Sequence, residues 1–268
     1  MKRYTIEVDT HTHSVLSGHA WSTVRENLAQ AKSLGLRGLC ITEHSSAVPG
    51  AAPEFAPFSL AMIPKEQDGI HVYYGLEADI LSADGTLCPA DKYLEMLEFC
   101  IASMHIVCSG LQRTKDVCTD AYLAVMKNPH VSVIGHADRT AFPCDLETVV
   151  REAGKHGMAM ELNNGSLIPA RAAGRPNVVR IAKLCMEHDV PVCVGSDAHY
   201  HTMIGDFGLV LDMLRELEFP EELILNATKE RFDRFIEDRR MAIENYYGSG
   251  EYATANKERL HGNQDSGL

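Results

Sequence analysis

Two short sequences place metal-ligand side chains at alternate positions: His11 and His13 in DTHTH, and Asp197 and His199 in SDAH. Alternate residues of an extended segment point the same way, so each pair can direct two side chains at one metal ion or at adjacent ions. The further candidates lie singly in turn-like sequences: His19, His44, Glu77, His105 and His136. We predict that these residues form one metal cluster.

The donors in this set are imidazoles and carboxylates, which suit zinc, manganese or iron without distinguishing among them. The chain has no C-x-x-C pair, which excludes a thiolate-rich structural zinc site. We interpret the eight cysteines as reduced core residues: Cys40, Cys88, Cys100, Cys108, Cys118, Cys144, Cys185 and Cys193. We interpret the remaining histidines as hydrogen-bonded or surface residues: His71, His130, His156, His188, His201 and His261.

The elements that must position the ligands are predicted from seven short runs rich in apolar and β-branched residues. These runs alternate with segments of helical periodicity, which predicts an α/β fold, and seven repeats favour a barrel over an open sheet. The strands are expected at residues 4–9, 38–42, 71–76, 99–104, 131–135, 158–162 and 192–195. A candidate ligand follows six of them, and the other ends in Asn163 and Asn164. Because barrels build their sites at the C-terminal strand ends, we expect the ligands to converge there.

Helix start signals precede three of the intervening segments, at Ser22 or Thr23, at Asp145, and at Pro176 or Asn177. Residues 45–70 contain repeated prolines, which predicts a long loop over the barrel mouth, with a lid role and plain irregular packing both open. Two closing helices are expected within 206–219 and 227–240. We predict one catalytic domain over 1–247 and a poorly ordered polar tail over 248–268.

The charge balance restricts the partners. A formal net charge of -12 disfavours binding to a long polyanion, because counterion release needs clustered Lys and Arg. No apolar run approaches the roughly 20 residues that span a bilayer, and the first residues lack the apolar region of a signal peptide. We expect a cytoplasmic protein without membrane association or stable nucleic-acid binding, and the oligomeric state is left open.

The segments DTHTHSVLSGH, ITEHS, GLEADI, SMH, GHADR and GSDAH, in this order, resemble the motif set of the polymerase-and-histidinol-phosphatase (PHP) family. The resemblance covers residues 4–240 and is strongest to stand-alone bacterial PHP phosphatases. It implies a distorted (β/α)7 barrel, similar to a TIM barrel, with three divalent metal ions at the C-terminal strand ends. Zinc is the first expectation, with manganese or iron as alternatives.

The resemblance also implies how the ligands divide. The first ion would be held by His11, His13, Glu77 and Asp197, the second by Glu77, His105 and His136, and the third by His19, His44 and His199. Glu77 would then bridge two ions, for which its two oxygens suit it. Next to these ligands lie Asp9, Glu43 and Asp138, each of which either orients an imidazole or serves as an ordinary cap or ion-pair residue.

Phosphate oxygens need cationic partners, and guanidinium groups match them in bidentate fashion. Arg171 and Arg175 follow the sixth predicted strand and Arg139 follows the fifth, so all three start from the expected face of the barrel. Arg171 ranks first because the resemblance implies an arginine there. Asn163 is a further candidate for contact with substrate or with water at the metal centre.

Closely spaced divalent ions activate water for attack on phosphorus, so the reaction needs no protein nucleophile. We therefore expect a phosphomonoesterase for a small phosphorylated metabolite or nucleotide, in which Glu77, Asp197 and Arg171 are catalytic. The alternatives are a histidinol-phosphate phosphatase, and a phosphodiesterase or 3'-5' exonuclease-like nuclease. The complete ligand set disfavours a non-catalytic metal-binding module.

Overall fold

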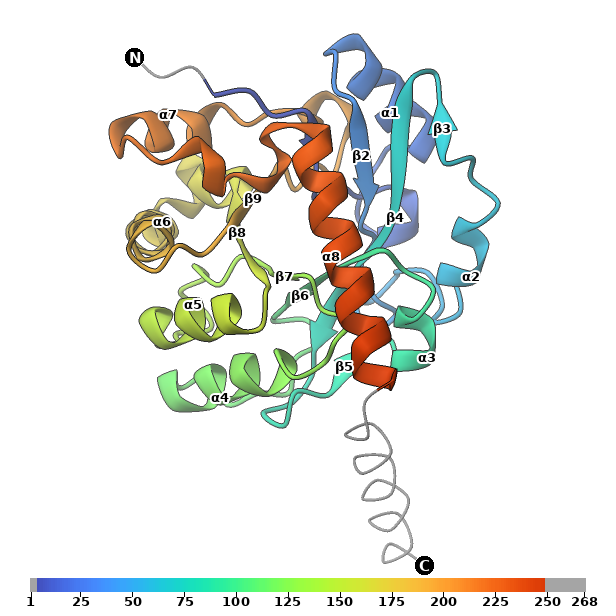
Figure 1. The fold of residues 1–268 in the computed structure, drawn as a ribbon. Helices are drawn as coiled ribbons and strands as arrows, with labels where there is room; N and C mark the ends of the chain where they lie inside the picture. The colour runs from blue at the N-terminus through green and yellow to red at the C-terminus, as the bar shows by residue number, and fades with distance from the viewer. Residues whose placement is uncertain (1–3, 249–268) are drawn as a thin grey trace, which may run out of the picture.

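A parallel sheet of seven strands forms the centre of the molecule (Figure 1). The structure is a computed structural model in which residues 4–248 are described. The strands follow the order β1, β2, β4, β6, β7, β8 and β9 around a sheet that nearly closes on itself, which confirms the predicted barrel. Their bounds are Val8–Asp9, Gly38–Ile41, Ile70–Ile80, Phe99–Ser103, Val133–Ile134, Ala159–Asn163 and Val192–Gly195.

One boundary difference concerns β4, which was predicted to end at residue 76 and continues to Ile80. The reason is a short antiparallel strand, β5 (Leu87–Cys88), which pairs with Asp79 and Ile80. Glu77 therefore lies inside a strand that is paired on both sides rather than in the turn that follows it.

The segment 45–70 is also more regular than the predicted loop. It contains α2 (Pro57–Leu60) and β3 (Glu66–Gln67), and β3 pairs antiparallel with the beginning of β4. Conversely, β1 is shorter than predicted: the Glu7 amide donates to the carbonyl of Asn226, while the Glu7 carbonyl accepts from the amides of Arg37 and Gly38 at the start of β2.

The first and last strands meet without a continuous ladder between them. Near their C-terminal ends, a parallel bridge joins Thr12 to Ala198. Closer to their beginnings, the buried Asn226 donates from Nδ2 to the carbonyls of Val8 (2.8 Å) and Val194 (2.7 Å), and its Oδ1 accepts from the Val194 amide (2.9 Å). The side-chain amide of Asn226 thus bonds to both strands where their pairing is missing, and the Thr10 hydroxyl adds a bond to the Val194 carbonyl.

Side chains alternate between the barrel interior and the surrounding helices, because successive strand residues point to opposite faces. In β4, Leu76 and Ala78 pack in the core beneath the helices, whereas Tyr73 lies in the interior cluster. Glu77 and Asp79 lie an even number of positions after Tyr73 in the strand, so their side chains share its inward face.

The long helix α8 (Lys229–Gly248) covers the end of the barrel at which the strands begin and crosses the front of Figure 1. Its Phe232 and Phe235 pack against interior residues from the strand starts, including Val8 and Phe99. This end is therefore filled with apolar side chains, which leaves the opposite end for polar chemistry.

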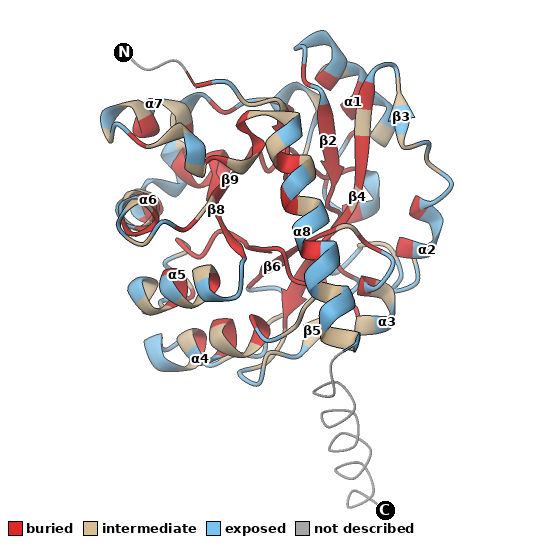
Figure 2. Cartoon of the chain, viewed as in Figure 1, coloured by how far each residue is buried: buried red, intermediate tan, exposed pale blue. Residues whose placement is uncertain are grey.

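The outer helices are α1 (Val24–Ser33), α3 (Asp91–Leu94), α4 (Lys115–Val125), α5 (Leu146–Lys155), α6 (Arg175–Glu187) and α7 (Gly208–Glu216). They turn one buried face to the sheet and one exposed face to solvent (Figure 2). The predicted caps at Thr23 and Asp145 are confirmed, since each side chain accepts a hydrogen bond from the first helical turn. Helix α6 begins earlier than the predicted start signal at Pro176 or Asn177. Its first residue is Arg175, Gly174 is the cap, and Pro176 lies in the first turn.

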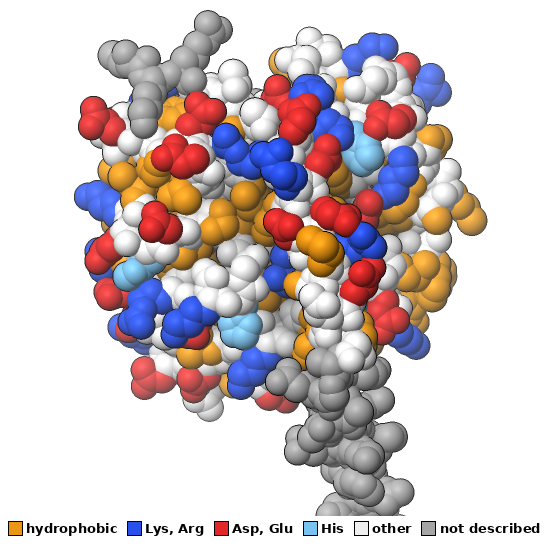
Figure 3. All heavy atoms as spheres, viewed as in Figure 1, with side chains coloured by type: hydrophobic (Ala, Val, Ile, Leu, Met, Phe, Trp, Pro, Cys, Tyr) orange, Lys and Arg blue, Asp and Glu red, His pale blue; other side chains and the backbone are white. Residues whose placement is uncertain are grey.

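The predicted polar tail stays a prediction. Helix α8 includes its first residue, Gly248, and residues 249–268 lie outside the described part of the chain. Within residues 4–248, every helix is too short or too polar to cross a membrane. On the face in Figure 3, the described Lys and Arg side chains are interspersed with Asp and Glu rather than gathered into one patch.

Candidate metal centre

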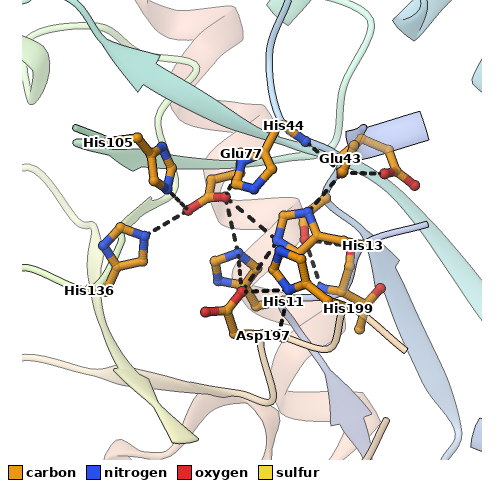
Figure 4. Close-up of polar contacts among 12 residues, drawn as sticks. His11, His13, Glu43, His44, Glu77, His105, His136, Asp197 and His199 are labelled. Carbon is orange, nitrogen blue, oxygen red and sulfur yellow. Dashed lines mark hydrogen bonds and ion pairs between the residues drawn. The ribbon is translucent and has the colours of Figure 1, made fainter. Parts of the chain in front are cut away.

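The side chains predicted as ligands meet at the end of the barrel where the strands finish (Figure 4). They come from segments spread over nearly 190 positions of the sequence, and each lies within ion-pair or ring-contact distance of another member: His11, His13, His19, His44, Glu77, His105, His136, Asp197 and His199. The convergence expected for C-terminal strand ends is therefore present in the fold.

The first group consists of two imidazoles that face two carboxylates. The Nε2 atoms of His11 and His13 lie 3.4 Å and 3.6 Å from Oε2 of Glu77. The same nitrogens lie 3.8 Å and 3.4 Å from Oδ1 of Asp197. Both Nε2 atoms and Oε2 of Glu77 are buried and find no hydrogen-bond partner within residues 4–248. A cation bound by these four residues would satisfy atoms whose burial is otherwise costly.

The second oxygen of Glu77 faces a different pair of imidazoles. Its Oε1 lies 2.9 Å from Nε2 of His136 and 3.4 Å from Nε2 of His105. One carboxylate thus presents one oxygen to each of two groups of nitrogen donors. This is the arrangement that a ligand shared by two cations requires.

The third predicted group is less separate from the first than the sequence suggested. His19 and His199 face each other with 2.9 Å between their Nε2 atoms, and the rings of His19 and His44 stack with centroids 4.9 Å apart. However, Nδ1 of His44 lies 2.8 Å from Oε2 of Glu77. His44 therefore touches both the first group and the outer pair of imidazoles.

Charge states in this cluster favour cation binding. Burial alone would raise the pKa values of the Glu77 and Asp197 carboxyls, but the surrounding imidazoles hold both pKa values well below their ordinary range. Burial and neighbouring imidazoles lower the pKa of His13, which keeps its ring neutral. Burial opposes protonation of His11 as well, but Glu161 and Glu77 raise its pKa well above the ordinary value. A cation would take the place of that proton.

Beside the cluster lies a cavity of about 640 Å³. Its lining includes His19, His44, His105, His136, Asp197 and His199, so the candidate ligands form part of its wall. This volume falls within the range of small-molecule sites in proteins.

Comparison with known proteins decides the family. A family model described as the PHP domain matches residues 9–165, more than half of the chain. The chain belongs to the PHP family. The prediction from the sequence motifs is therefore confirmed.

Several curated relatives of this PHP protein have similar length. A probable phosphatase of Caldicellulosiruptor saccharolyticus is 38% identical over a match that covers 86% of this chain and 96% of the relative. A probable phosphatase of Acetivibrio thermocellus is 37% identical, with 88% and 97% covered. These relatives support the predicted class, a metal-dependent phosphatase.

A solved structure shares the fold of this PHP protein at lower identity. It is the histidinol phosphate phosphatase of Lactococcus lactis complexed with zinc, L-histidinol and phosphate. The TM-score is 0.56 at 19% identity, and the match covers 81% of this chain and 95% of that one. The likeness establishes a common PHP fold.

Two carboxylates that contact the imidazoles of the candidate metal centre, here called the PHP site, were not among the site residues predicted from the sequence. Oε1 of Glu161 lies 2.5 Å from Nδ1 of His11, and its Oε2 accepts from the backbone amide of His136 at 2.7 Å. Oδ1 of Asp79 lies 2.7 Å from Nδ1 of His105. The position of Asp79 two residues after Glu77 in a strand was a usable signal, because both must share one face. Glu161 pairs with a residue 150 positions away, and no local pattern indicates that contact.

The three acidic neighbours named from the sequence have different places. Glu43 accepts from Ser17 Oγ, which lies 2.9 Å from Nδ1 of His13, so Glu43 supports that imidazole through a serine. Asp9 accepts instead from backbone amides, among them those of Ser196 and Gly205, and so fixes loops rather than a ring. Asp138 is buried in the cavity wall.

Two of the three candidate arginines reach the PHP site. Arg171 Nη1 and Arg139 Nη2 lie 3.4 Å and 3.6 Å from Oδ2 of Asp197, and both residues line the cavity. Arg175 lies on α6, where its Nη2 is 3.8 Å from Oε2 of Glu216 on α7, and it does not belong to the described lining of the cavity.

Asn163, the amide candidate, is fully buried and hydrogen-bonded inside the chain. Its Nδ2 donates to Oε1 of Glu161 at 3.3 Å, and its Oδ1 accepts from the Ser166 amide at 3.2 Å. These contacts tie Asn163 to Glu161, the carboxylate that is hydrogen-bonded to His11.

Proposed function

We propose that this protein is a phosphomonoesterase that hydrolyses a small phosphorylated metabolite or nucleotide with the help of three divalent metal ions, zinc first among them. The observation that carries the proposal is the position of Glu77, with one oxygen toward His11 and His13 and the other toward His105 and His136. A mononuclear site would not need a carboxylate between two groups of imidazoles.

Each part of the site has a defined task in this proposal. When bound, the ions supply an activated water nucleophile and positive charge for the phosphoryl oxygens. His11, His13, Glu77 and Asp197 hold the first ion; Glu77, His105 and His136 hold the second; His19, His44 and His199 hold the third. Glu161 and Asp79 fix the rings of His11 and His105, so that their Nε2 atoms remain directed at the centre.

Asp197 connects the metal ligands to Arg139 and Arg171, which we call the phosphate clamp. Its Oδ1 faces His11 and His13, whereas its Oδ2 faces the guanidinium groups of Arg171 and Arg139. A phosphate bound at the centre would therefore lie beside two guanidinium groups, which donate to its oxygens and neutralise their charge. We assign catalytic roles to Glu77, Asp197 and Arg171 and substrate contact to Arg139.

The reaction class is tested with the purified, metal-replete protein on p-nitrophenyl phosphate and on bis(p-nitrophenyl) phosphate. We expect a clear preference for the monoester, and loss of activity after chelation that zinc or manganese restores. A preference for the diester would instead establish the nuclease alternative. Histidinol phosphate belongs in the same assay, because a much higher kcat/KM for it than for other monoesters would establish that specific phosphatase.

The clamp is tested with a matched pair of arginine variants. Arg171→Ala should lower kcat/KM for the monoester by about tenfold to 150-fold, the effect of losing a charged hydrogen bond of about 1.5–3 kcal/mol. Arg175→Ala removes the same group from the neighbouring helix, where it pairs with Glu216, and should leave kcat/KM nearly unchanged. Equal effects of the two substitutions would remove Arg171 from the clamp. Metal content, measured for both, should stay at the level of the parent protein.

A further inference from the structure

The cavity beside the metal centre has walls of two kinds. Arg139 and Arg171 lie on the side of Asp197, where the phosphate is proposed to bind. Other parts of the lining are apolar, and we call them the apolar wall: Val48, Pro49, Ile106, Val107 and Phe142. They come from the segments that follow β2, β6 and β7, which are also the segments that carry ligands.

Three members of the apolar wall are exposed: Pro49, Ile106 and Val107. Ile106 and Val107 follow the ligand His105 directly, and they are 62% and 64% exposed. A ligand that covers these two adjacent branched side chains gains binding free energy, because apolar area buried contributes about 25 cal/mol per Å². A leaving group that extends from the bound phosphate is the group with access to them.

The carboxylates of the cavity are unable to receive a cationic leaving group. The described lining contains two of them, Asp138 and Asp197, which are 2% and 6% exposed. Asp197 is already surrounded by imidazoles and by the two arginines. An ammonium group in this cavity would lose water without gaining an exposed anionic partner, and the guanidinium groups would repel it.

We propose that the apolar wall selects the leaving group, so that the enzyme prefers phosphomonoesters of uncharged alcohols with an apolar surface over those that carry an ammonium group. This inference rests on the proposed phosphomonoesterase function and narrows its substrate class. The specificity-determining residues are Ile106 and Val107.

The test compares two isosteric substrates, butyl phosphate and 3-aminopropyl phosphate, which differ by a methyl group in place of an ammonium. The ammonium makes its alcohol the slightly better leaving group, so intrinsic reactivity does not favour butyl phosphate. We expect kcat/KM for butyl phosphate to be higher by about tenfold or more, the usual lower range for discrimination in an apolar pocket. Equal values, or a preference for the amine, would overturn the proposal.

A pair of variants at Val107 separates charge from shape. Val107→Asp places a carboxylate on the wall, whereas Val107→Asn has the same shape without the charge. We expect the aspartate variant to reduce the preference for butyl phosphate by about fivefold or more relative to the asparagine variant, since only the carboxylate can pair with the ammonium. Indistinguishable ratios in the two variants would show that residue 107 does not meet the leaving group.

The proposed function and this inference can fail separately. Hydrolysis of p-nitrophenyl phosphate by the parent protein is measured in the same experiment. If that hydrolysis is absent with full metal content, the phosphomonoesterase function is wrong. If it is present while the two alkyl substrates react equally, only the role of the apolar wall is wrong.

Discussion

Glu77 and Asp197 are both carboxylates within the metal centre, but their second oxygens have different neighbours. In Asp197 that oxygen faces Arg139 and Arg171. In Glu77 it faces His105 and His136 instead. Only Glu77 therefore has imidazoles on both sides, and only Glu77 suits a bridge between two cations.

The bridge leads to a prediction for Glu77→Gln. The substitution keeps the volume but removes the charge that screens the repulsion between two neighbouring ions. We expect the loss of at least one metal equivalent and a fall of several orders of magnitude in the single-turnover rate. Metal analysis and a single-turnover assay on the same preparation check this.

His199→Ala is the comparison for that experiment. His199 contacts His19 at the outer side of the cluster, so its loss should empty mainly the third site and leave the other two ions in place. Retention of three equivalents and near-normal turnover by Glu77→Gln would show that Glu77 is not a bridge.

Glu161 leads to a second prediction about a single residue of the metal centre. Its two oxygens hold the ring of His11 and the backbone of His136, which belong to different ion groups. Glu161→Ala should therefore weaken metal affinity by about tenfold to a hundredfold, as measured for other residues that orient metal ligands. Competition with a chromogenic chelator measures this without any assay of activity.

The conservative variant Glu161→Gln identifies the cause. Glutamine can still accept from His11 Nδ1 but turns an N–H group toward the His136 amide, so it should recover part of the affinity that alanine loses. If alanine and glutamine weaken binding equally, the charge of Glu161 matters and the hydrogen bond does not. If neither changes the affinity, Glu161 is not a positioning residue for the metal centre.

At the scale of elements, the barrel depends on how β1 and β9 are joined. The ligands that follow these two strands, His11 and Asp197, must lie side by side, and the Asp197 amide donates to the His11 carbonyl at 3.0 Å. Asp197 has a φ of 56°, a left-handed conformation that costs about 1–3 kcal/mol for a residue other than glycine. Gly195 is needed nearby, since a Cβ there would lie 2.6 Å from the Cβ of His11.

Asn226 provides a test of this junction away from the metal centre. Asn226→Ala removes the partner of the Val8 carbonyl and of the Val194 amide, whereas the Val194 carbonyl keeps the hydroxyl of Thr10, and each buried group that loses its partner costs about 1–3 kcal/mol. We expect the free energy of unfolding to fall by about 3 kcal/mol or more, as urea denaturation would measure. The half-buried Asn128 donates to the side chain of Asp91 and accepts from the His130 amide, neither of which joins β1 to β9, so Asn128→Ala should cost much less. Equal costs would contradict the role of Asn226 as the link between the strands.

At the scale of the whole molecule, the two ends of the barrel have opposite character. The end under α8 is filled by Phe232, Phe235 and the apolar residues around them. The other end gathers buried imidazoles and carboxylates, several of which have no hydrogen-bond partner in residues 4–248. The stability of the molecule should therefore depend on cations at that end.

This dependence gives the last prediction. Metal-replete protein should contain close to three equivalents of zinc, manganese or iron per chain. Chelation should lower the melting temperature by several degrees, because a ligand that binds only the folded state stabilises it by mass action. Elemental analysis with calorimetry before and after chelation checks both. One equivalent or less would contradict the trinuclear site, and an unchanged melting temperature would contradict the coupling to stability.

The sequence by itself was sufficient for the barrel and for the convergence of the nine candidate ligands. The reason is that strand alternation is a local rule, and that every barrel strand delivers its following segment to the same end of the fold. Seven repeats of strand and helix, each followed by a donor or an amide, therefore determine which end of the molecule is polar. The His-x-His and Asp-x-His pairs follow the same rules.

Only the tertiary structure decided which further residues join the site. Glu161 reaches His11 across the barrel, and Arg139 and Arg171 reach Asp197 while Arg175 turns toward Glu216. Glu161 lies within β8, so strand alternation sets the face on which it lies but not its partner. The two arginines lie in irregular segments after the strands, where no period relates one side chain to the next. Contacts between such segments follow from the closure of the whole barrel, so they could not be predicted from any stretch of the sequence alone.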